Sequence, residues 1–307
     1  MIATYRRESR LAFLLEALAE QTLDPARFEV IVVRAEAPGA KAEPPTALDV
    51  RFLDGPAVAG PGELRNIGWP AARAPLVAFT DDDCRPTPGW LAALLEAHAS
   101  SPEAVLQGPT QPDPDELPQL YGLARTQAID GPTPWYETCN IAYPRTLLES
   151  LGGFDEEFDG GGEDADLGLR AVAGGARREF VPNAGVWHAV HARHLWDAVR
   201  DARRWHTIPL VIGRHPEQRE QLELGLFWRA GHSRVLAALA GVALGRGRPA
   251  LALAATAPYL RHHLRGYGGG GRAVARALVD LPARAVVDLA GVAATARAAI
   301  RHRTAVL

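Results

Sequence analysis

Three consecutive aspartates, Asp81, Asp82 and Asp83, are the residues of this 307-residue chain whose type and spacing point most directly to chemistry. They follow the apolar run LVAFT at residues 76–80, which predicts a buried strand. Ligands of open α/β sheets bind outside the carboxyl ends of the strands. Adjacent carboxylates there repel one another unless a cation joins them, and Mg²⁺ or Mn²⁺ bridging a substrate diphosphate would do so. The alternative is a polar turn that caps the following helix.

A second acidic cluster, Glu163, Asp164 and Asp166, opens a predicted helix directly after the glycine run at residues 160–162. A carboxylate at this place could act as a general base that takes a proton from an acceptor hydroxyl. The alternative is simple complementation of the helix dipole, the commoner role of acids in a first turn. His188 ends the last strand predicted before residue 190 and could bind the same metal ion, although a lone histidine is more often structural.

Alternating strand-like and helix-like segments must position these side chains. Short apolar runs predict strands, and leucines at the spacing of one helix face predict amphipathic helices. The expected strands are residues 28–33, 50–53, 76–80 and 180–188, and the expected helices are residues 8–22, 88–99, 144–151 and 163–175. This alternation predicts an α/β fold with a mostly parallel sheet flanked by helices.

The C-terminal third of the chain differs from the rest in charge and pattern. Residues 1–190 carry a net charge of −14, whereas residues 191–307 are helical in pattern and carry +11. The basic region could face anionic lipid, polymer or nucleic acid, or its arginines could reflect genome base composition. The apolar stretches 235–245 and 249–260 are each too short to span a bilayer. They could form a hairpin at the membrane interface, or pack against the body or in a dimer.

The two cysteines and the first ten residues give an indication of the cellular compartment. Cys84 and Cys139 lie far apart without a CxxC partner, so their spacing indicates neither a disulfide framework nor a zinc site. Residues 1–10, MIATYRRESR, are not followed by the apolar run of a secretory signal. We therefore expect a cytoplasmic protein.

The order of these motifs resembles the family 2 inverting glycosyltransferases of the GT-A fold over residues 1 to about 190. The resemblance implies a bacterial enzyme with a Rossmann-like, nucleotide-sugar-binding catalytic domain in residues 1–190. It says little about residues 191–307, the helical, basic region that could lie at the membrane interface or pack within the protein. The segments that carry it are IATYRR, LLEALAEQT with FEVIVV, RNIGWPAA, LVAFTDDDCRPTPGWL, ETCNIAYPRTLLESLGGFDEEF, GGEDADLGLR and VPNAGVWH.

The resemblance also implies a reaction: metal-dependent, inverting transfer of a sugar from a nucleoside-diphosphate sugar to an acceptor hydroxyl. The basic, partly apolar tail indicates an acceptor at the membrane surface and hence a cell-envelope glycan, glycolipid or polysaccharide. Asp164 would be the base, with Glu163 and Trp135 on the acceptor side. Mn²⁺ or Mg²⁺ would be bound by Asp83, His188 and Asp81. The donor would contact Thr4, Tyr5, Glu36, Arg65, Asn66, Asp81, Asp82, Thr138 and Asn140.

Two departures from the family pattern affect this interpretation. Family members carry a base-binding aspartate after the second strand, and here only Glu36 could substitute for it. The chain also begins within its first strand, which we expect to be truncated. The competing hypotheses are a degenerate protein that binds a nucleotide sugar without transfer, and a nucleotidyltransferase, which would release pyrophosphate.

The expected partners follow from the same interpretation. They are the nucleotide-sugar donor, a carbohydrate or lipid-linked acceptor, an anionic membrane surface at the inner face of the cell membrane and a second copy in a homodimer. Nucleic acid is not expected as a partner.

Overall fold

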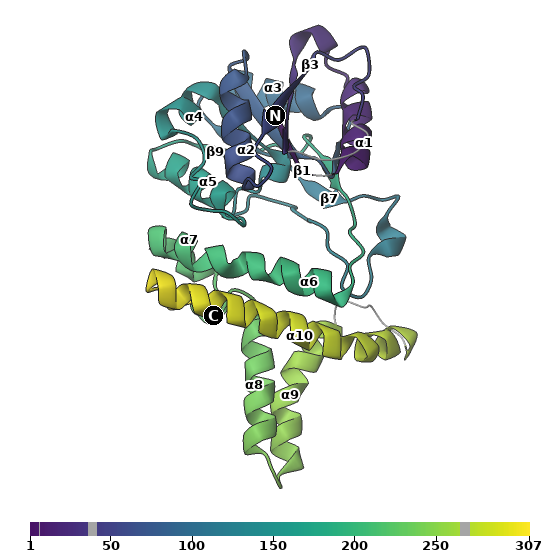
Figure 1. The fold of residues 1–307 in the computed structure, drawn as a ribbon, viewed down its shortest axis with the longest axis vertical. Helices are drawn as coiled ribbons and strands as arrows, with labels where there is room; N and C mark the ends of the chain where they lie inside the picture. Colours follow the sequence, from purple (N-terminus) through teal and green to yellow (C-terminus); the bar gives the residue numbers. More distant parts are fainter. Residues whose placement is uncertain (6, 36–41, 265–270) are drawn as a thin grey trace. The chain divides into compact units, whose positions relative to one another are not determined.

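The computed structural model describes residues 1–5, 7–35, 42–264 and 271–307 (Figure 1). This part of the chain divides into two compact units. The first comprises Met1–Leu117 and Thr126–Val190, and the second comprises Pro118–Arg125 and His191–Leu307. Residues 118–125, which the predicted boundary near residue 190 assigns to the first domain, thus group with the C-terminal helices.

A seven-stranded sheet organises the first unit, in the order β3-β2-β1-β4-β8-β6-β9. Neighbouring strands among β1 to β4 run parallel, whereas β8 is antiparallel to both of its neighbours. The strands are β1 (Ile2–Tyr5), β2 (Val30–Ala35), β3 (Val50–Gly55), β4 (Leu76–Asp81), β6 (Val105–Gln107), β8 (Ile141–Pro144) and β9 (Arg178–Phe180). The predicted α/β class with a mostly parallel sheet is confirmed.

Helices that cover this sheet carry the predicted apolar faces. Leu11, Leu14, Leu15 and Leu18 of the first helix are all buried, as their spacing predicts. The helices of the first unit are α1 (Glu8–Ala19), α2 (Pro61–Gly68), α3 (Trp90–Ser100), α4 (Arg145–Leu151) and α5 (Glu163–Ala173).

A three-stranded sheet lies beside the end of β4, in the order β5 (Cys84–Pro86), β10 (Val186–His188) and β7 (Thr110–Pro112). The strand predicted over residues 180–188 is wrong as a single element. Its first residue, Phe180, ends β9 in the large sheet, and its last three residues form β10 in the small one. Pro182 and Asn183 lie between the two strands, where proline cannot donate a ladder hydrogen bond and asparagine favours a turn.

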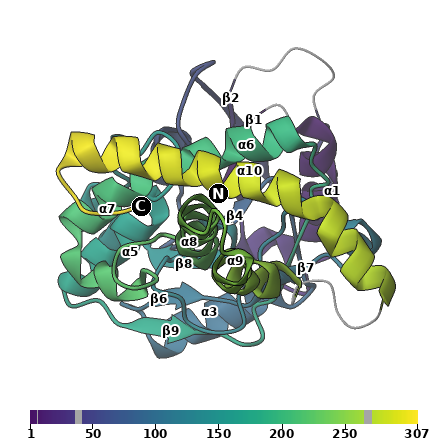
Figure 2. The same cartoon turned by 90° about the horizontal axis from the view of Figure 1, so that it is seen from below.

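The second unit is helical, as predicted. Its α-helices are α6 (Leu195–Ala202), α7 (Ile208–Arg214), α8 (Ala230–Leu244), α9 (Pro249–Leu264) and α10 (Gly271–His302). Helices α8 and α9 form an antiparallel pair whose base packs on α10, and Figure 2 looks almost along the axes of this pair. Within the described ranges, none of the helices combines the length and the apolarity needed to cross a bilayer.

One close approach inside the first unit offers a test of the packing beside the acidic cluster of α5. A Cβ added at Gly168, in the middle of α5, would lie 2.1 Å from Cγ of the buried Tyr136. Gly168→Ala should therefore lower the free energy of unfolding by about 1–3 kcal/mol, although alanine is the better helix former. Urea denaturation measures this loss. Gly131→Ala, where the new methyl group meets nothing within 4 Å, is the control and should change stability little. Equal stability of the two variants would contradict the close packing.

Candidate active site

The candidate site lies at the carboxyl ends of β1 and β4. In the sheet, β2 and β3 lie to one side of β1, and β4 lies to its other side. The strand order therefore reverses between β1 and β4, which makes a topological switch point there. β4 ends at Asp81, and Asp82 and Asp83 occupy the turn before β5. The three aspartates are therefore at the edge of the sheet where α/β proteins bind ligands, as the sequence predicts.

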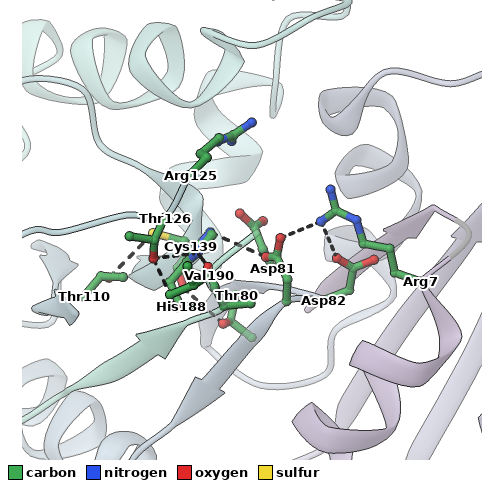
Figure 3. Close-up of polar contacts among 12 residues, drawn as sticks. Arg7, Thr80, Asp81, Asp82, Thr110, Arg125, Thr126, Cys139, His188 and Val190 are labelled. Atoms are coloured by element: carbon green, nitrogen blue, oxygen red, sulfur yellow. Dashed lines mark hydrogen bonds and ion pairs between the residues drawn. The ribbon is translucent and has the colours of Figure 1, made fainter. Parts of the chain in front are cut away.

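Arg7 neutralises the second and third aspartates. Its Nη1 donates to Oδ1 of Asp82 at 3.1 Å (Figure 3) and to Oδ2 of Asp83 at 2.6 Å. The Thr4 hydroxyl donates to Oδ2 of Asp82 at 2.7 Å. Burial raises the pKa of Asp82 to about 6, against the opposing effect of Arg7 and with a further contribution from Asp83. The sequence interpretation missed Arg7. Its signal was a cation two residues beyond the end of β1, at the same sheet edge as the aspartates.

Arg65, on α2, joins the two acidic clusters. Its Nη2 donates to Oδ1 of Asp81 at 2.9 Å, and its Nη1 donates to Oε1 of Glu163 at 2.6 Å. Arg65 and Glu163 are only 5% and 3% exposed. Burial alone would lower the pKa of Arg65, but the carboxylates of Asp81 and Glu163 raise it above its usual value. The guanidinium therefore stays charged and holds the start of α5 against the end of β4.

The turn before α5 sets the position of its first carboxylates. Gly161 and Gly162 have φ values of 137° and 93°, which glycine adopts far more readily than other residues. Asp164 follows Glu163 and is only partly exposed. Burial raises the pKa of Asp164 well above its ordinary value, Glu163 adds to this rise and Arg65 opposes it. A carboxyl group with a raised pKa is a stronger base once it is ionised.

Asp166, the third acid of this cluster, has a structural role in the protein. Its Oδ2 accepts from Nε of Arg170 at 2.8 Å, and the same guanidinium donates to the carbonyl oxygens of Leu151 and Gly153. This ion pair fixes the turn after α4 to α5.

Two of the residues predicted to contact the donor, Asn66 and Asn140, have amide groups that form hydrogen bonds within the protein, and their contact with the donor stays a prediction. Asn66 Nδ2 donates to the Phe154 carbonyl and its Oδ1 accepts from the Phe154 N–H, which ties α2 to the turn before α5. Asn140 is fully buried: Oδ1 accepts from Trp90 Nε1, and Nδ2 donates to the carbonyl oxygens of Pro109 and Ala184. Both residues position the walls of the site.

Asp83 and His188 approach each other across the small sheet. His188 pairs with Cys84 in the β10–β5 register, and its Nε2 lies 3.6 Å from Oδ1 of Asp83. Nδ1 of His188 lies 2.8 Å from the Ala189 carbonyl, so the tautomer that donates there presents the lone pair of Nε2 toward Asp83. In the part of the chain that the structure describes, ligand atoms of Asp83, Cys84 and His188 lie within 4.8 Å of one another.

This donor set fits a divalent cation. One carboxylate and one oriented imidazole can bind Mn²⁺ or Mg²⁺, whose other ligands are commonly water and substrate phosphate. Burial raises the pKa of the Cys84 thiol well above its usual value, so sulfur is the weakest of the three donors. The predicted third ligand, Asp81, is not in this group and is bound by Arg65.

The other predicted residues differ in their exposure to solvent. Tyr5 is exposed at the end of β1, Thr138 is buried in the 3₁₀ turn Thr138–Asn140 and Trp135 is half-buried. Cys139 is buried and free, as expected of a packing residue. Glu36 lies outside the described residues.

Residues 1–154 match the family model described as Glycosyl transferase family 2, so the chain belongs to this family. The pre-mycofactocin glycosyltransferase of Mycobacterium tuberculosis is 31% identical over 185 residues, covering 55% of this chain and 38% of that protein. The validoxylamine A glucosyltransferase of Streptomyces hygroscopicus subsp. limoneus is 31% identical over 218 residues, covering 57% and 48%. The chain thus spans less than half the length of these curated relatives.

A solved structure shows the same fold. The mannosyltransferase PcManGT from Pyrobaculum calidifontis, in complex with GDP-Man and Mn²⁺, has a TM-score of 0.58 at 19% identity and covers 96% of this chain and 85% of its own. The predicted GT-A fold is confirmed.

The link between the acidic clusters can be tested by removing its cation. Arg65→Met would leave the buried Glu163 carboxylate uncompensated, so we expect a loss of about 3–5 kcal/mol in the free energy of unfolding. Adding Glu163→Gln to this variant should restore part of the loss, because the unpaired charge is then removed. Chemical denaturation of the four proteins of this cycle gives the coupling energy. Arg73→Met is the surface control with small effect, since Arg73 is 65% exposed despite its ion pairs with Glu29 and Asp49. Strictly additive losses would refute the link.

Proposed function

We propose that this protein is a metal-dependent, inverting glycosyltransferase that moves a sugar from a nucleoside-diphosphate sugar to an acceptor hydroxyl. The observation that carries the proposal is the Arg65 bridge, which brings Asp81 at the end of β4 and Glu163 at the start of α5 to one guanidinium. A donor site and a candidate base thereby share one edge of the sheet. Membership of glycosyl transferase family 2 supports the same reaction.

Asp164 is the general base in this proposal. It accepts the proton of the acceptor hydroxyl while that oxygen bonds to the anomeric carbon of the donor sugar. The bond from that carbon to the diphosphate oxygen breaks in the same displacement, which inverts the anomeric centre and releases the nucleoside diphosphate. Glu163 is held by Arg65, and its buried Oε2 has no hydrogen-bond partner among the residues that the structure describes. That oxygen can accept a hydrogen bond from a hydroxyl of an incoming sugar.

Asp83 and His188 would hold the divalent ion, either Mn²⁺ or Mg²⁺. Such an ion supplies positive charge for the departing diphosphate. Arg7 now shares the carboxylate of Asp83, so it can exchange that contact for a phosphate oxygen of the donor. Thr4 keeps Asp82 in place through its hydroxyl. Tyr5 and Thr138 would contact the donor, as the family resemblance implies.

The acceptor is a carbohydrate or a lipid-linked molecule presented at the inner face of the cell membrane, and the product belongs to a cell-envelope glycan, glycolipid or polysaccharide. The support for this assignment is the net charge of +11 on residues 191–307, which suits an anionic surface.

Replacing the base tests the reaction. Asp164→Asn should reduce sugar transfer, or donor hydrolysis where no acceptor is supplied, by about 100-fold or more, because the amide cannot take the proton. The assay follows release of UDP, GDP or dTDP from the corresponding sugars with Mn²⁺. Donor binding by equilibrium dialysis should persist in the variant. Glu149→Gln, at an exposed carboxylate of α4, is the matched control and should act like the unmodified protein.

The pH profile gives an independent reading of the same base. Because Asp164 works when ionised and its pKa is raised, activity should fall as the pH drops through a value well above the ordinary range of aspartate. An unchanged rate in Asp164→Asn would overturn the assignment. Release of pyrophosphate would indicate nucleotidyl transfer, and donor binding without any turnover would indicate a binding protein.

A further inference from the structure

The outer half of the α8–α9 pair exposes apolar side chains around a short turn. Figure 1 shows both helices extending away from α10, which contacts only their base. The apolar side chains nearest the turn are exposed, with Leu244 at 84% and Leu251 at 53%. Further back from the turn, Leu239, Val242 and Leu253 are also exposed. We call residues 239–254 the hairpin tip.

The tip is built as a stable element despite this exposure. A Cβ at Gly241 would lie 2.1 Å from Cβ of Ala255, so the missing side chain allows the two helices to approach closely. At the base, Val235, Ala238 and Tyr259 pack with residues of α10, and the Tyr259 hydroxyl donates to Asp288 at 2.9 Å. The hairpin therefore presents its tip on an anchored support.

The charge at the tip indicates which kind of partner could bind there. Arg246 and Arg248 are exposed in the turn itself, and residues 224–279 contain no aspartate or glutamate. Pairing the tip with its counterpart on a second copy would bring these arginines together without any acid of the segment to offset them. A surface with negative charge and an apolar interior complements both the leucines and the arginines.

We propose that the hairpin tip docks on an anionic lipid surface. Leu244, Leu251 and Leu253 enter the boundary between headgroups and acyl chains, and Arg246 and Arg248 bind lipid phosphates. Amphipathic elements lie about 5–10 Å deep in this boundary, a depth that one or two helical turns cover. In the outer part of α8, residues 239, 240 and 242–244 are exposed. Exposure on successive positions suits a helix end that is surrounded by lipid. The proposal rests on the membrane assignment in the proposed function and names the segment that would meet the anionic surface, but it does not depend on the transfer reaction.

Vesicle sedimentation of the full chain tests the proposal. Vesicles of phosphatidylcholine with phosphatidylglycerol should bind the protein, and pure phosphatidylcholine vesicles should bind it weakly. Leu244→Ser with Leu253→Ser, and separately Arg246→Glu with Arg248→Glu, should each weaken binding by roughly tenfold or more. The matched control is Ile300→Ser with Arg301→Glu, an exposed apolar and basic pair near the end of α10, and it should bind as before.

Three results would overturn the proposal. The first is no binding to anionic vesicles, and the second is equal loss in the hairpin and control variants. The third is a dimer in solution that the leucine variant converts to a monomer while no protein binds vesicles, which would assign the tip to a second copy. Donor hydrolysis is measured alongside, and its retention in the hairpin variants separates this proposal from the proposed transfer reaction.

Discussion

Mutual repulsion among carboxylates is the constraint on which the first unit depends. Asp81, Asp82, Asp83 and Glu163 converge at one sheet edge, three of them almost fully buried, and buried charges require partners. Two arginines meet this need: Arg7 bridges the second and third aspartates, while Arg65 bridges the other two acids. The arginines come from separate helical regions, so the electrostatic balance of the site also fixes how those regions pack.

Buried amides supply the geometry that charge alone cannot. Hydrogen bonds are directional, and leaving an amide unpaired in the interior is costly, so a residue such as Asn66 admits few backbone arrangements around it. It holds the Phe154 turn, and Asn140 holds two loops that border the small sheet. That sheet in turn brings His188 opposite Cys84 and next to Asp83. The candidate cation site thus depends on ordinary neutral hydrogen bonds.

Local patterns were enough to predict helices α1, α3, α4 and α5, strands β2 to β4 and the place of the aspartates, but not α2 or β6. The leucine spacing predicts the amphipathic helix α1, and the apolar run predicts the buried strand β4. Because ligands of open α/β sheets bind at the carboxyl ends of the strands, Asp81 is then expected at the ligand-binding edge. The features that local patterns do not reveal depend on distant partners. Nothing near Asn66 or Asn140 in the sequence shows that these amides form hydrogen bonds with Phe154 and Ala184. The division of residues 180–188 between two sheets likewise depends on strands elsewhere in the chain.

We infer that this carboxylate edge holds a divalent cation for a nucleoside diphosphate. An anomalous difference map of crystals grown with Mn²⁺ and UDP, GDP or dTDP in turn would locate that ion. We expect a peak within coordination distance of the Asp83 carboxylate and His188 Nε2, next to the diphosphate, and we expect His188→Ala to lose it. A peak elsewhere, or a nucleotide bound at this edge with no metal beside it, would show that this edge is not the metal site.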